Sequence, residues 1–305
     1  MEKFIKSLIL FALPIVLFMI FAEILFRHIP NQYSYKANYL ETHGKQVEIL
    51  ILGSSHSLYG IDPGEFSYKT FNAAHVSQSL DLDYAILQKY LNKLPNLKTV
   101  VIPVSYGSLF AKLDFGIEKW RVKDYSIYYG LNISVPFEKR FEIFSKGNIQ
   151  KLKDHVLGKT DLGITELGLG TNLRKRTKEN LQESGKTAAN RHTKEKDTAQ
   201  TMLPRMQSYL KSIIESCQKK NCHVILLTMP AWHTYRENMD AWQWGKTLET
   251  VQELEKHYPN IHYFNFIADS RFVANDFNDA DHLNLHGTKK MSKILNSLEF
   301  NRRSK

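Results

Sequence analysis

Residues 47–57 read Val-Glu-Ile-Leu-Ile-Leu-Gly-Ser-Ser-His-Ser. The stretch from Val47 to Leu52 has the length and the largely apolar character of a β-strand, and Gly53 ends it. Polar residues 54–57 follow at once, so the strand leads into a turn in which a serine hydroxyl can be exposed as a nucleophile. In parallel α/β sheets, ligands bind beyond the carboxyl ends of the strands, which is where this turn must lie.

A second polar stretch lies near the C-terminus. Residues 279–287 read Asp-Ala-Asp-His-Leu-Asn-Leu-His-Gly and supply two carboxylates and two imidazoles ahead of a helix. A serine hydroxyl attacks poorly at neutral pH unless a base takes its proton, and that base works best when a carboxylate orients it. Asp279 and His282 are three residues apart, so both can project from one loop toward one site. Asp281 lies in the same loop and is the alternative orienting acid.

The rest of the chain alternates between apolar runs of strand length and segments with helical spacing. The run at 99–104 is apolar almost throughout, as in a parallel sheet that is covered on both faces. The alternation predicts an α/β fold with three layers, α/β/α, in which helices cover both faces of a parallel sheet. Strands are predicted at 47–53, 68–74, 99–104, 223–229 and 262–267, and helices at 82–94, 202–217, around 248–254 and from about 285 onward.

The two polar stretches resemble the motifs of the SGNH, or GDSL-like, hydrolase superfamily. They are more closely similar to its membrane-anchored branch, which is associated with acyl groups on cell-envelope polymers. The resemblance covers about residues 45–298, with a divergent middle. It implies a flavodoxin-like three-layer domain in which Ser55 is the nucleophile, His282 the base and Asp279 the orienting acid.

The sequence departs from this family where donors to an oxyanion are needed. The family's loop glycine falls on Ser77, and its side-chain donor, an asparagine, falls on Tyr106. Acyl transfer requires hydrogen-bond donors aimed at the developing oxyanion. The candidates are therefore the backbone N–H of Ser55 or Ser77 and the hydroxyl of Ser105 or Tyr106.

Several neighbours of these motifs have open or structural interpretations. His56 is either a second polar contact to the substrate or an ordinary loop histidine, and Tyr235 either lines the pocket or packs a loop. Ser54 and Ser57 are expected to bond the turn backbone. In the last helix, Asn284 is a good N-cap and His286 is expected to lie in the first turn.

No cofactor and no metal is expected, because no zinc-type spacing of ligands exists. Cys217 and Cys222 are the only cysteines of the chain. They are expected to be two separately buried thiols, with a disulfide as the alternative in an oxidising compartment.

The N-terminal residues 1–28 are predicted to be a transmembrane signal anchor. Residues 7–22 carry no charge, and with its ends the apolar stretch reaches about 20 residues, enough to cross a hydrocarbon core of roughly 30 Å. A cleaved signal peptide is the alternative, but small residues at the expected cleavage spacing are missing. Lys3 and Lys6 precede the span and Arg27 follows it, so charge gives only a modest bias on orientation.

The remaining chain is predicted to be a juxtamembrane linker at 29–45 and one SGNH-like domain at 46–305, with an insertion at about 106–200. The aromatic-rich part of the insertion, 106–148, is expected to form a small helical or irregular cap. Residues 171–200 carry eight Lys or Arg against four Asp or Glu and few large apolar residues, which predicts a mobile loop.

The net charge of +10 fits either attraction to anionic lipids or acidic polymers, or simply a solvated basic surface. No nucleic-acid-binding module is recognisable, so no nucleic-acid partner is expected. The leading hypothesis is a membrane-anchored, extracytoplasmic serine acyl esterase or O-acyltransferase that acts on cell-envelope glycans through an acyl-enzyme at Ser55. The alternative is a non-catalytic binding or assembly protein for an envelope polymer or a membrane acyl-donor partner. A plain membrane scaffold is the third hypothesis.

Overall fold

The structure, a computed structural model, describes residues 1–145, 147–172 and 180–303, except for the side chains of 138 and 300–303. The chain forms two compact units. The first comprises Met1–Ala37 and Trp120–Leu162, and the second comprises Asn38–Lys119 and Gly163–Lys305.

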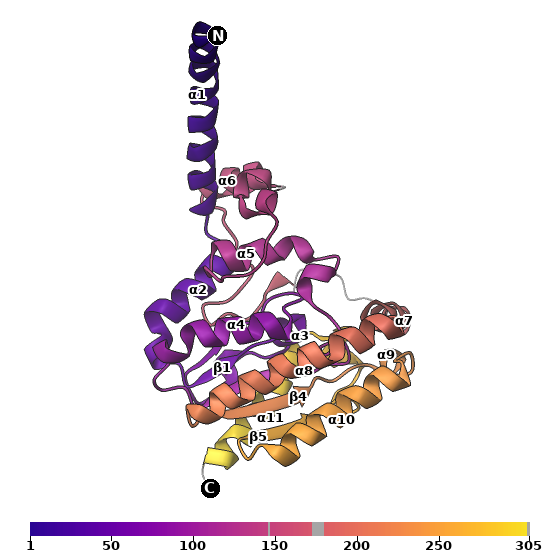
Figure 1. The fold of residues 1–305 in the computed structure, drawn as a ribbon. Helices are drawn as coiled ribbons and strands as arrows, with labels where there is room; N and C mark the ends of the chain where they lie inside the picture. The colour runs from indigo at the N-terminus through magenta and orange to yellow at the C-terminus, as the bar shows by residue number, and fades with distance from the viewer. Residues whose placement is uncertain (146, 173–179, 304–305) are drawn as a thin grey trace. The chain divides into compact units, whose positions relative to one another are not determined.

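The second unit is built on a five-stranded parallel sheet with the strand order β2-β1-β3-β4-β5. Strands β1, β4 and β5 of this sheet are labelled in Figure 1. The sheet's three central strands are buried on both faces, which explains their nearly continuous runs of Val, Ile and Leu. The sheet confirms the five predicted strands, although each is slightly shorter than its apolar run. The strands are β1 (Ile49–Ile51), β2 (Thr70–Asn72), β3 (Thr99–Pro103), β4 (His223–Thr228) and β5 (Ile261–Asn265).

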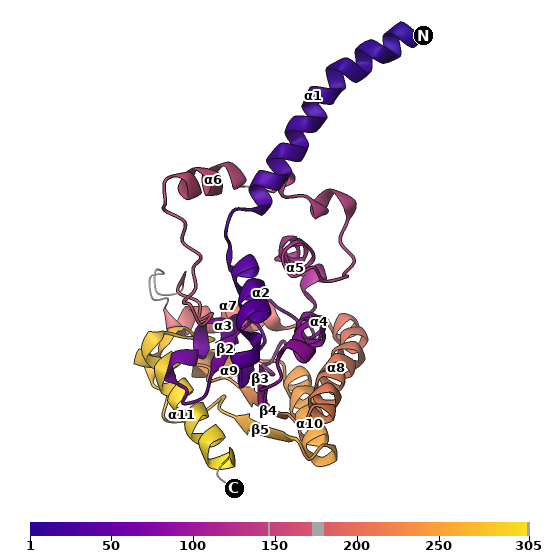
Figure 2. The same ribbon diagram turned by 90° about the vertical axis from the view of Figure 1, so that its left-hand side faces the viewer.

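Helices cover both faces of this sheet, so the predicted three-layer α/β/α architecture is confirmed. Figure 2 shows α11 (Leu285–Arg303) on one side of the strands and α4 (Leu80–Tyr90), α8 (Lys196–Lys219) and α10 (Ala241–His257) on the other. The core under α11 joins Ile49 and Ile51 of β1 to apolar residues of that helix. Alternate residues of each strand thus serve the two cores.

A short hairpin follows β5 and was not predicted. Its antiparallel strands are β6 (Phe277–Asp279) and β7 (His282–Leu283), and Asp279 pairs with His282 across them. Strands of two or three residues carry too little periodicity to be recognised in a sequence. The hairpin determines how the two side chains face each other.

The prediction that residues 171–200 form a mobile loop is wrong for the part that the structure describes, and 173–179 lie outside it. Helices α7 (Leu181–His192) and α9 (His233–Arg236) pack closely together, and α8 already begins at Lys196. A Cβ atom at Gly185 would lie 2.2 Å from Oγ1 of Thr234. Small residues such as Gly185 and Ala189 therefore bring the two helices together without the large apolar side chains that mark most packed helices.

The first unit contains α1 (Glu2–Arg27), α5 (Val122–Ile127) and α6 (Asn148–Val156). Within the described residues, α1 alone is long and apolar enough to cross a membrane, a property that a signal sequence shares. The predicted linker at 29–45 contains a helix, α2 (Gln32–His43), and the predicted insertion at 106–200 is divided between the two units.

The two cysteines are free and buried, as expected for separate thiols. The Sγ atom of Cys222 lies 3.0 Å from the carbonyl oxygen of Leu97 and donates a hydrogen bond to it.

Candidate active site

The turn after β1 presents Ser55 as the first residue of helix α3 (Ser55–Gly60). Gly53 makes this turn with a φ of 108°, a conformation that side chains with a Cβ atom rarely adopt. A Cβ atom there would also lie 2.6 Å from Oγ of Ser57. The N–H of Gly53 donates a hydrogen bond of 2.8 Å to the buried carboxylate of Asp83. This bond holds the turn against helix α4.

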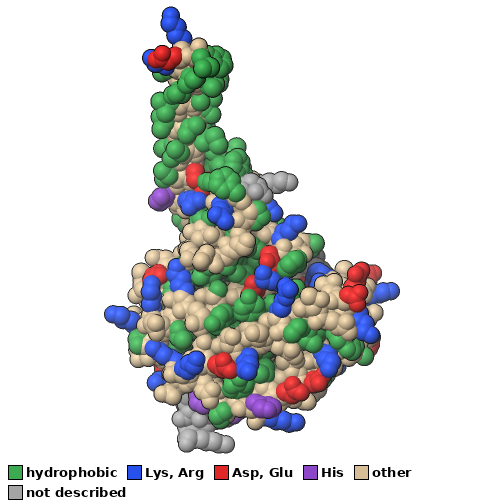
Figure 3. All heavy atoms as spheres, viewed as in Figure 1, with side chains coloured by type: hydrophobic (Ala, Val, Ile, Leu, Met, Phe, Trp, Pro, Cys, Tyr) green, Lys and Arg blue, Asp and Glu red, His purple; other side chains and the backbone are tan. Residues whose placement is uncertain are grey.

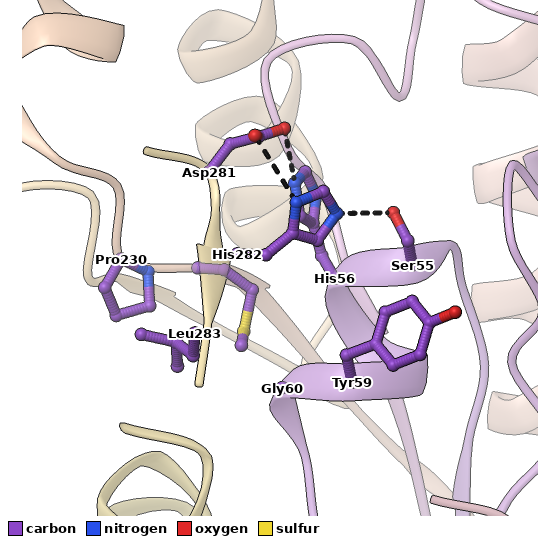
Figure 4. Close-up of a pocket in the computed structure, with 9 residues that line it drawn as sticks. Ser55, His56, Tyr59, Gly60, Pro230, Asp281, His282 and Leu283 are labelled. Atoms are coloured by element: carbon purple, nitrogen blue, oxygen red, sulfur yellow. Dashed lines mark hydrogen bonds and ion pairs between the residues drawn. The ribbon is translucent and has the colours of Figure 1, made fainter. Parts of the chain in front are cut away.

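Three of the predicted residues meet at this turn. The Oγ of Ser55 lies 2.9 Å from Nε2 of His282 (Figure 4). Nδ1 of His282 lies 2.9 Å and 3.1 Å from the two carboxylate oxygens of Asp279. With its Nδ1–H donated to Asp279, the neutral imidazole leaves Nε2 as an acceptor for the serine hydroxyl.

The hairpin holds Asp279 in place. The N–H groups of Asp281 and His282 both donate to Oδ1 of Asp279, at 3.1 Å and 2.8 Å. The carboxylate is therefore oriented by the backbone of the loop as well as by the imidazole. Between the two candidate acids, the shorter distances assign the orienting contact to Asp279.

Asp281 has a different position, in which its carboxylate faces one guanidinium and three imidazoles. Its Oδ1 lies 3.4 Å from Nδ1 of His282, and its Oδ2 lies 3.5 Å from Nε2 of His56 (Figure 4). The same Oδ2 lies 3.3 Å from Nη2 of Arg191. Nδ1 of His192 is 3.7 Å from the same Oδ2. Asp281 thus supplies a second negative charge beside His282.

These charges control the protonation of the site. Burial disfavours the imidazolium form of His282, but the charge of Asp281 and the hydrogen bond to Asp279 outweigh it and raise the pKa of His282 to about 10. Although burial opposes ionisation, His282 and its neighbours hold the pKa of Asp281 well below its usual value. Burial lowers the pKa of His192 to about 3, against the attraction of Asp281, so that His192 is neutral. An imidazolium at His282 is strongly stabilised.

His56 forms part of the wall of the site. Its side chain is buried, and its ring centroid lies 5.0 Å from that of His282. Within the described residues, its Nδ1 atom has no hydrogen-bond partner. His56 is therefore held by Asp281 at one nitrogen and available at the other.

A small, shallow pocket lies in front of these residues. Its polar side is formed by Ser55, His56, Asp281 and His282. Its other walls are formed mainly by Tyr59, Met229, Pro230 and Leu283. The pocket combines a hydroxyl and an imidazole with an apolar wall.

Two backbone N–H groups at this edge are free to bind an oxygen. Ser77 has a φ of 58°, a left-handed conformation that glycine adopts readily and that fits the glycine of the family pattern. Ser55 is the first residue of α3, where the N–H groups of a helix lack intrahelical acceptors. In the described part of the chain, neither amide donates a hydrogen bond.

The two hydroxyl candidates have other partners, so the expectation that Tyr106 replaces the family's side-chain donor is not met. The Tyr106 side chain is fully buried, its hydroxyl pairs with Oγ1 of Thr193 at 2.7 Å, and it accepts from the N–H of Asp240 at 2.8 Å. Ser105 and Ser108 pair through their hydroxyls at 3.0 Å. The order of residues in a motif does not reveal the direction of a side chain.

Tyr235 does not line the pocket. Its buried hydroxyl lies 2.9 Å from Nδ1 of His192, so it contacts a residue that in turn faces Asp281. Its packing role in the small cluster with Tyr106 and Ala280 matches the second of the two interpretations.

Sequence reasoning missed Asp83, Arg191 and His192. Asp83 lies among the apolar positions of α4, and nothing in its spacing indicates that its carboxylate accepts a hydrogen bond from the turn after β1. Arg191 and His192 belong to the polar stretch that was expected to be mobile. Only the packing of α7 brings them to Asp281.

The structural expectations for Ser57 and Asn284 are confirmed, since Ser57 donates to the Leu52 carbonyl and Asn284 accepts from two N–H groups of the last helix.

His56, Asp281 and His282 hold their potential metal-ligand atoms within 4.8 Å of one another. The chemistry of this group fits a metal poorly. Both nitrogens of His282 already have partners, and the Arg191 guanidinium lies 3.3 Å from Asp281 where a cation would be expected. These contacts suit charge balance among the side chains better than they suit a metal ion.

The fold and the site together define a three-layer α/β/α protein in which a serine, a histidine and an aspartate meet at the carboxyl edge of a parallel sheet. No protein-family model and no curated protein matches the chain.

Among solved structures, the chain is similar to three bacterial proteins at low identity. One, from Streptococcus pneumoniae, is provisionally described as a platelet activating factor (11% identity, 95% of this chain and 98% of that one, TM-score 0.45). Another, from Bacteroides fragilis, is provisionally described as an acylhydrolase (12% identity, 88% of this chain and 96% of that one, TM-score 0.43). The third is a GDSL-like lipase from Bacteroides thetaiotaomicron (11% identity, 88% of this chain and 99% of that one, TM-score 0.43). Because each TM-score is below 0.5, the chemistry has to be inferred from the side chains of this chain.

Proposed function

We propose that this protein is a serine-dependent acyl esterase or O-acyltransferase that acts through an acyl-enzyme at Ser55. The observation that carries this proposal is the continuous path of hydrogen bonds from Ser55 Oγ to His282 Nε2 at 2.9 Å and from His282 Nδ1 to Asp279 at 2.9 Å. A hydroxyl, a base and an orienting acid in this geometry are the components of nucleophilic acyl transfer.

In the proposed first half-reaction, Ser55 Oγ attacks the acyl carbonyl carbon while Nε2 of His282 takes the hydroxyl proton. The N–H groups of Ser55 and Ser77 are the proposed donors to the oxyanion. When the tetrahedral intermediate collapses, the leaving alkoxide takes the proton from His282, and an acyl ester remains on Ser55. Asp279 and Asp281 stabilise the imidazolium during these steps.

In the second half-reaction, an acceptor hydroxyl attacks the acyl-enzyme, and His282 again takes and returns the proton. Water as the acceptor gives an esterase, and a glycan hydroxyl gives an O-acyltransferase. The substrate is proposed to be an acylated cell-envelope glycan, because the motifs resemble the envelope branch of the superfamily and α1 is long enough to anchor the chain.

Single-pass topology with the second unit outside the cytoplasm is part of this proposal, since an extracytoplasmic polymer can be reached only from that side. A C-terminal fusion to alkaline phosphatase, which is active only after export, tests it. Activity is expected. An inactive but well-expressed fusion would place the domain in the cytosol.

A non-catalytic binding or assembly protein for an envelope polymer or a membrane acyl-donor partner is the second candidate. One observation favours it, because the hydroxyl that replaces the family's side-chain oxyanion donor, that of Tyr106, is buried and already paired. Such a protein would keep the fold and bind acylated glycan without forming an acyl-enzyme.

Labelling with a fluorophosphonate probe separates the two candidates. The wild-type protein is expected to be labelled, and Ser55→Ala is expected to lose all labelling. Ser54→Ala is the matched control, since this neighbouring serine makes no side-chain capping bond and should keep the label. A folded wild-type protein that takes no label would rule out the enzyme and leave the binding protein.

A further inference from the structure

Large apolar side chains are exposed in the first unit, outside α1. Apart from Trp120, they lie in the segment from Phe137 to Ser145 and in α6 with the residue that follows it. Figure 3 shows hydrophobic side chains both along α1 and where this part of the same unit adjoins it. The exposed fractions are 73% for Phe137, 61% for Phe144, 80% for Ile149, 77% for Val156 and 53% for Leu157.

Hydrogen bonds fix the first of these segments to the C-terminal end of α1. The N–H of Ile143 donates to Oε2 of Glu23 at 2.9 Å, and Nη2 of Arg27 donates to the carbonyl of Arg140 at 2.9 Å. Glu23 and Arg27 are the charged residues that end the apolar run of α1. The segment therefore lies at the level where a membrane-spanning α1 would leave the hydrocarbon core, and Figures 1 and 2 both show α6 near this end of α1.

Helix α6 has the pattern of a helix that lies in a membrane interface. Ile149, Leu152 and Val156 recur at intervals of three and four residues, so they share one face. Both helix lysines are exposed; Lys151 lies on another side of the helix, whereas Lys153, four residues after Ile149, borders the apolar face. An apolar face combined with lysines favours the boundary between acyl chains and anionic headgroups.

The charge around these segments is basic as well. Between Phe137 and Asp161 the sequence has six Lys or Arg against four Asp or Glu, namely Glu138, Glu142, Asp154 and Asp161. The nearby acid Glu142 is buried and ion-paired with Lys123, so it contributes little negative charge to the surface. Basic groups close to a membrane span attract anionic lipids.

We propose that Phe137, Phe144, Ile149, Val156 and Leu157 form an interfacial platform that inserts between the headgroups of an anionic phospholipid membrane beside α1. The proposal rests on the proposed membrane-spanning role of α1 and adds a second point of attachment. A lipid surface is the occupant that fits, because the platform continues the exposed apolar surface of α1 at the end of its span and is bordered by lysines. A second copy of this chain would have to compete with the lipid that surrounds α1.

The test uses the full chain in nanodiscs of phosphatidylcholine and phosphatidylglycerol. Single cysteines at Ile149 or Val156 carry a fluorophore, and spin-labelled phospholipids quench it according to depth. The native cysteines are buried and leave the introduced one selectively reactive. Gln150 on α6 is the exposed control, and Leu17 on α1 reports the span itself.

Labels at positions 149 and 156 are expected to lose roughly half of their emission to quenchers placed near the headgroups, as expected for a helix seated about 5–10 Å into the boundary. The label at 150 should be quenched much less, and the label at 17 mainly by quenchers deep in the acyl chains. Val156 labelled in an Ile149→Asp background should lose its quenching, whereas Gln150→Asp should preserve it. Ile149 is exposed, so this variant is expected to keep the thermal midpoint.

Each other result overturns the proposal in a distinct way. Quenching at 17 without quenching at 149 and 156 would retain the anchor and exclude the platform. Absence of quenching at all three positions would exclude both. Energy transfer between labels on separate copies in place of lipid quenching would identify a contact between copies. Fluorophosphonate labelling of Ser55 in the same samples reports the proposed enzyme activity independently.

Discussion

Replacing Asp281 with asparagine should move the pH dependence of catalysis to lower pH. The base must be neutral to accept the proton of Ser55, and the two aspartates raise the pKa of His282 to about 10. The wild-type rate should therefore still be rising with pH through the alkaline range. Removing the charge of Asp281 makes the imidazolium less stable, so the base becomes available at lower pH.

The expected size follows from the geometry. Oδ1 of Asp281 lies 3.4 Å from Nδ1 of His282. At an effective dielectric constant of about 20, two unit charges at that distance interact by about 5 kcal/mol, which is an upper bound. The Arg191 guanidinium beside the same carboxylate offsets part of this attraction. We expect a decrease in the pKa of His282 of about 1–3 units, where each unit corresponds to about 1.4 kcal/mol.

The assay is the pH profile of kcat/KM for a chromogenic acetyl ester, combined with an NMR titration of the His282 ring. Asp276→Asn is the matched control, because Asp276 is a buried acid that pairs with His286 and Lys290 away from the serine. If kcat/KM of folded Asp281→Asn rises with pH over the same range as that of the wild type, the electrostatic role of Asp281 is refuted.

Three further predictions concern stability. The pKa of His282 is raised from 6.5 to about 10, so its ion pairs stabilise the fold fully below pH 6.5 and stop doing so as pH rises through about 10. The midpoint of urea unfolding should therefore fall between these two pH values. It should fall less in His282→Gln, which lacks the titrating group. Gly185→Ala should lower the free energy of unfolding by about 1–3 kcal/mol, because the added Cβ would lie 2.2 Å from Oγ1 of Thr234. Gly245→Ala is the control, since a Cβ there has no neighbour within 4 Å, and it should leave stability unchanged or raise it. Thermal denaturation measures both variants. Tyr106→Phe should lower the free energy of unfolding by about 1 kcal/mol and leave kcat/KM nearly unchanged. A large loss of kcat/KM at unchanged stability would instead identify the Tyr106 hydroxyl as a donor to the oxyanion.

The sequence predicted the sheet and the three residues at its edge because each leaves a linear signal. Ser55 follows a strand and a glycine, and Asp279 and His282 are three residues apart before a helix. The choice between Asp279 and Asp281 could not be made from spacing, since both lie in one loop. The hairpin decides it, and its strands are too short to be seen in the sequence.

The errors have identifiable physical causes. Helix α7 packs through Gly185, Ala188 and Ala189, and small residues give no apolar periodicity even when the helix they form is buried. Arg191 and His192, which α7 brings to Asp281, were therefore missed with it. For Tyr106, the family pattern gave the position in the chain but not the direction of the side chain, which points into the packed cluster with Tyr235.

The central proposal is that Ser55 becomes acylated with His282 as its base. Mass spectrometry of peptides after brief exposure to an activated acetyl ester tests this most directly, with the wild type compared to Ser55→Ala and His282→Ala. We predict an acetyl adduct on Ser55 in the wild type, none in Ser55→Ala, and accumulation slowed by a factor of roughly 10³ or more in His282→Ala. An unmodified Ser55 in the folded wild-type protein, or equal acetylation in His282→Ala, would contradict the proposal.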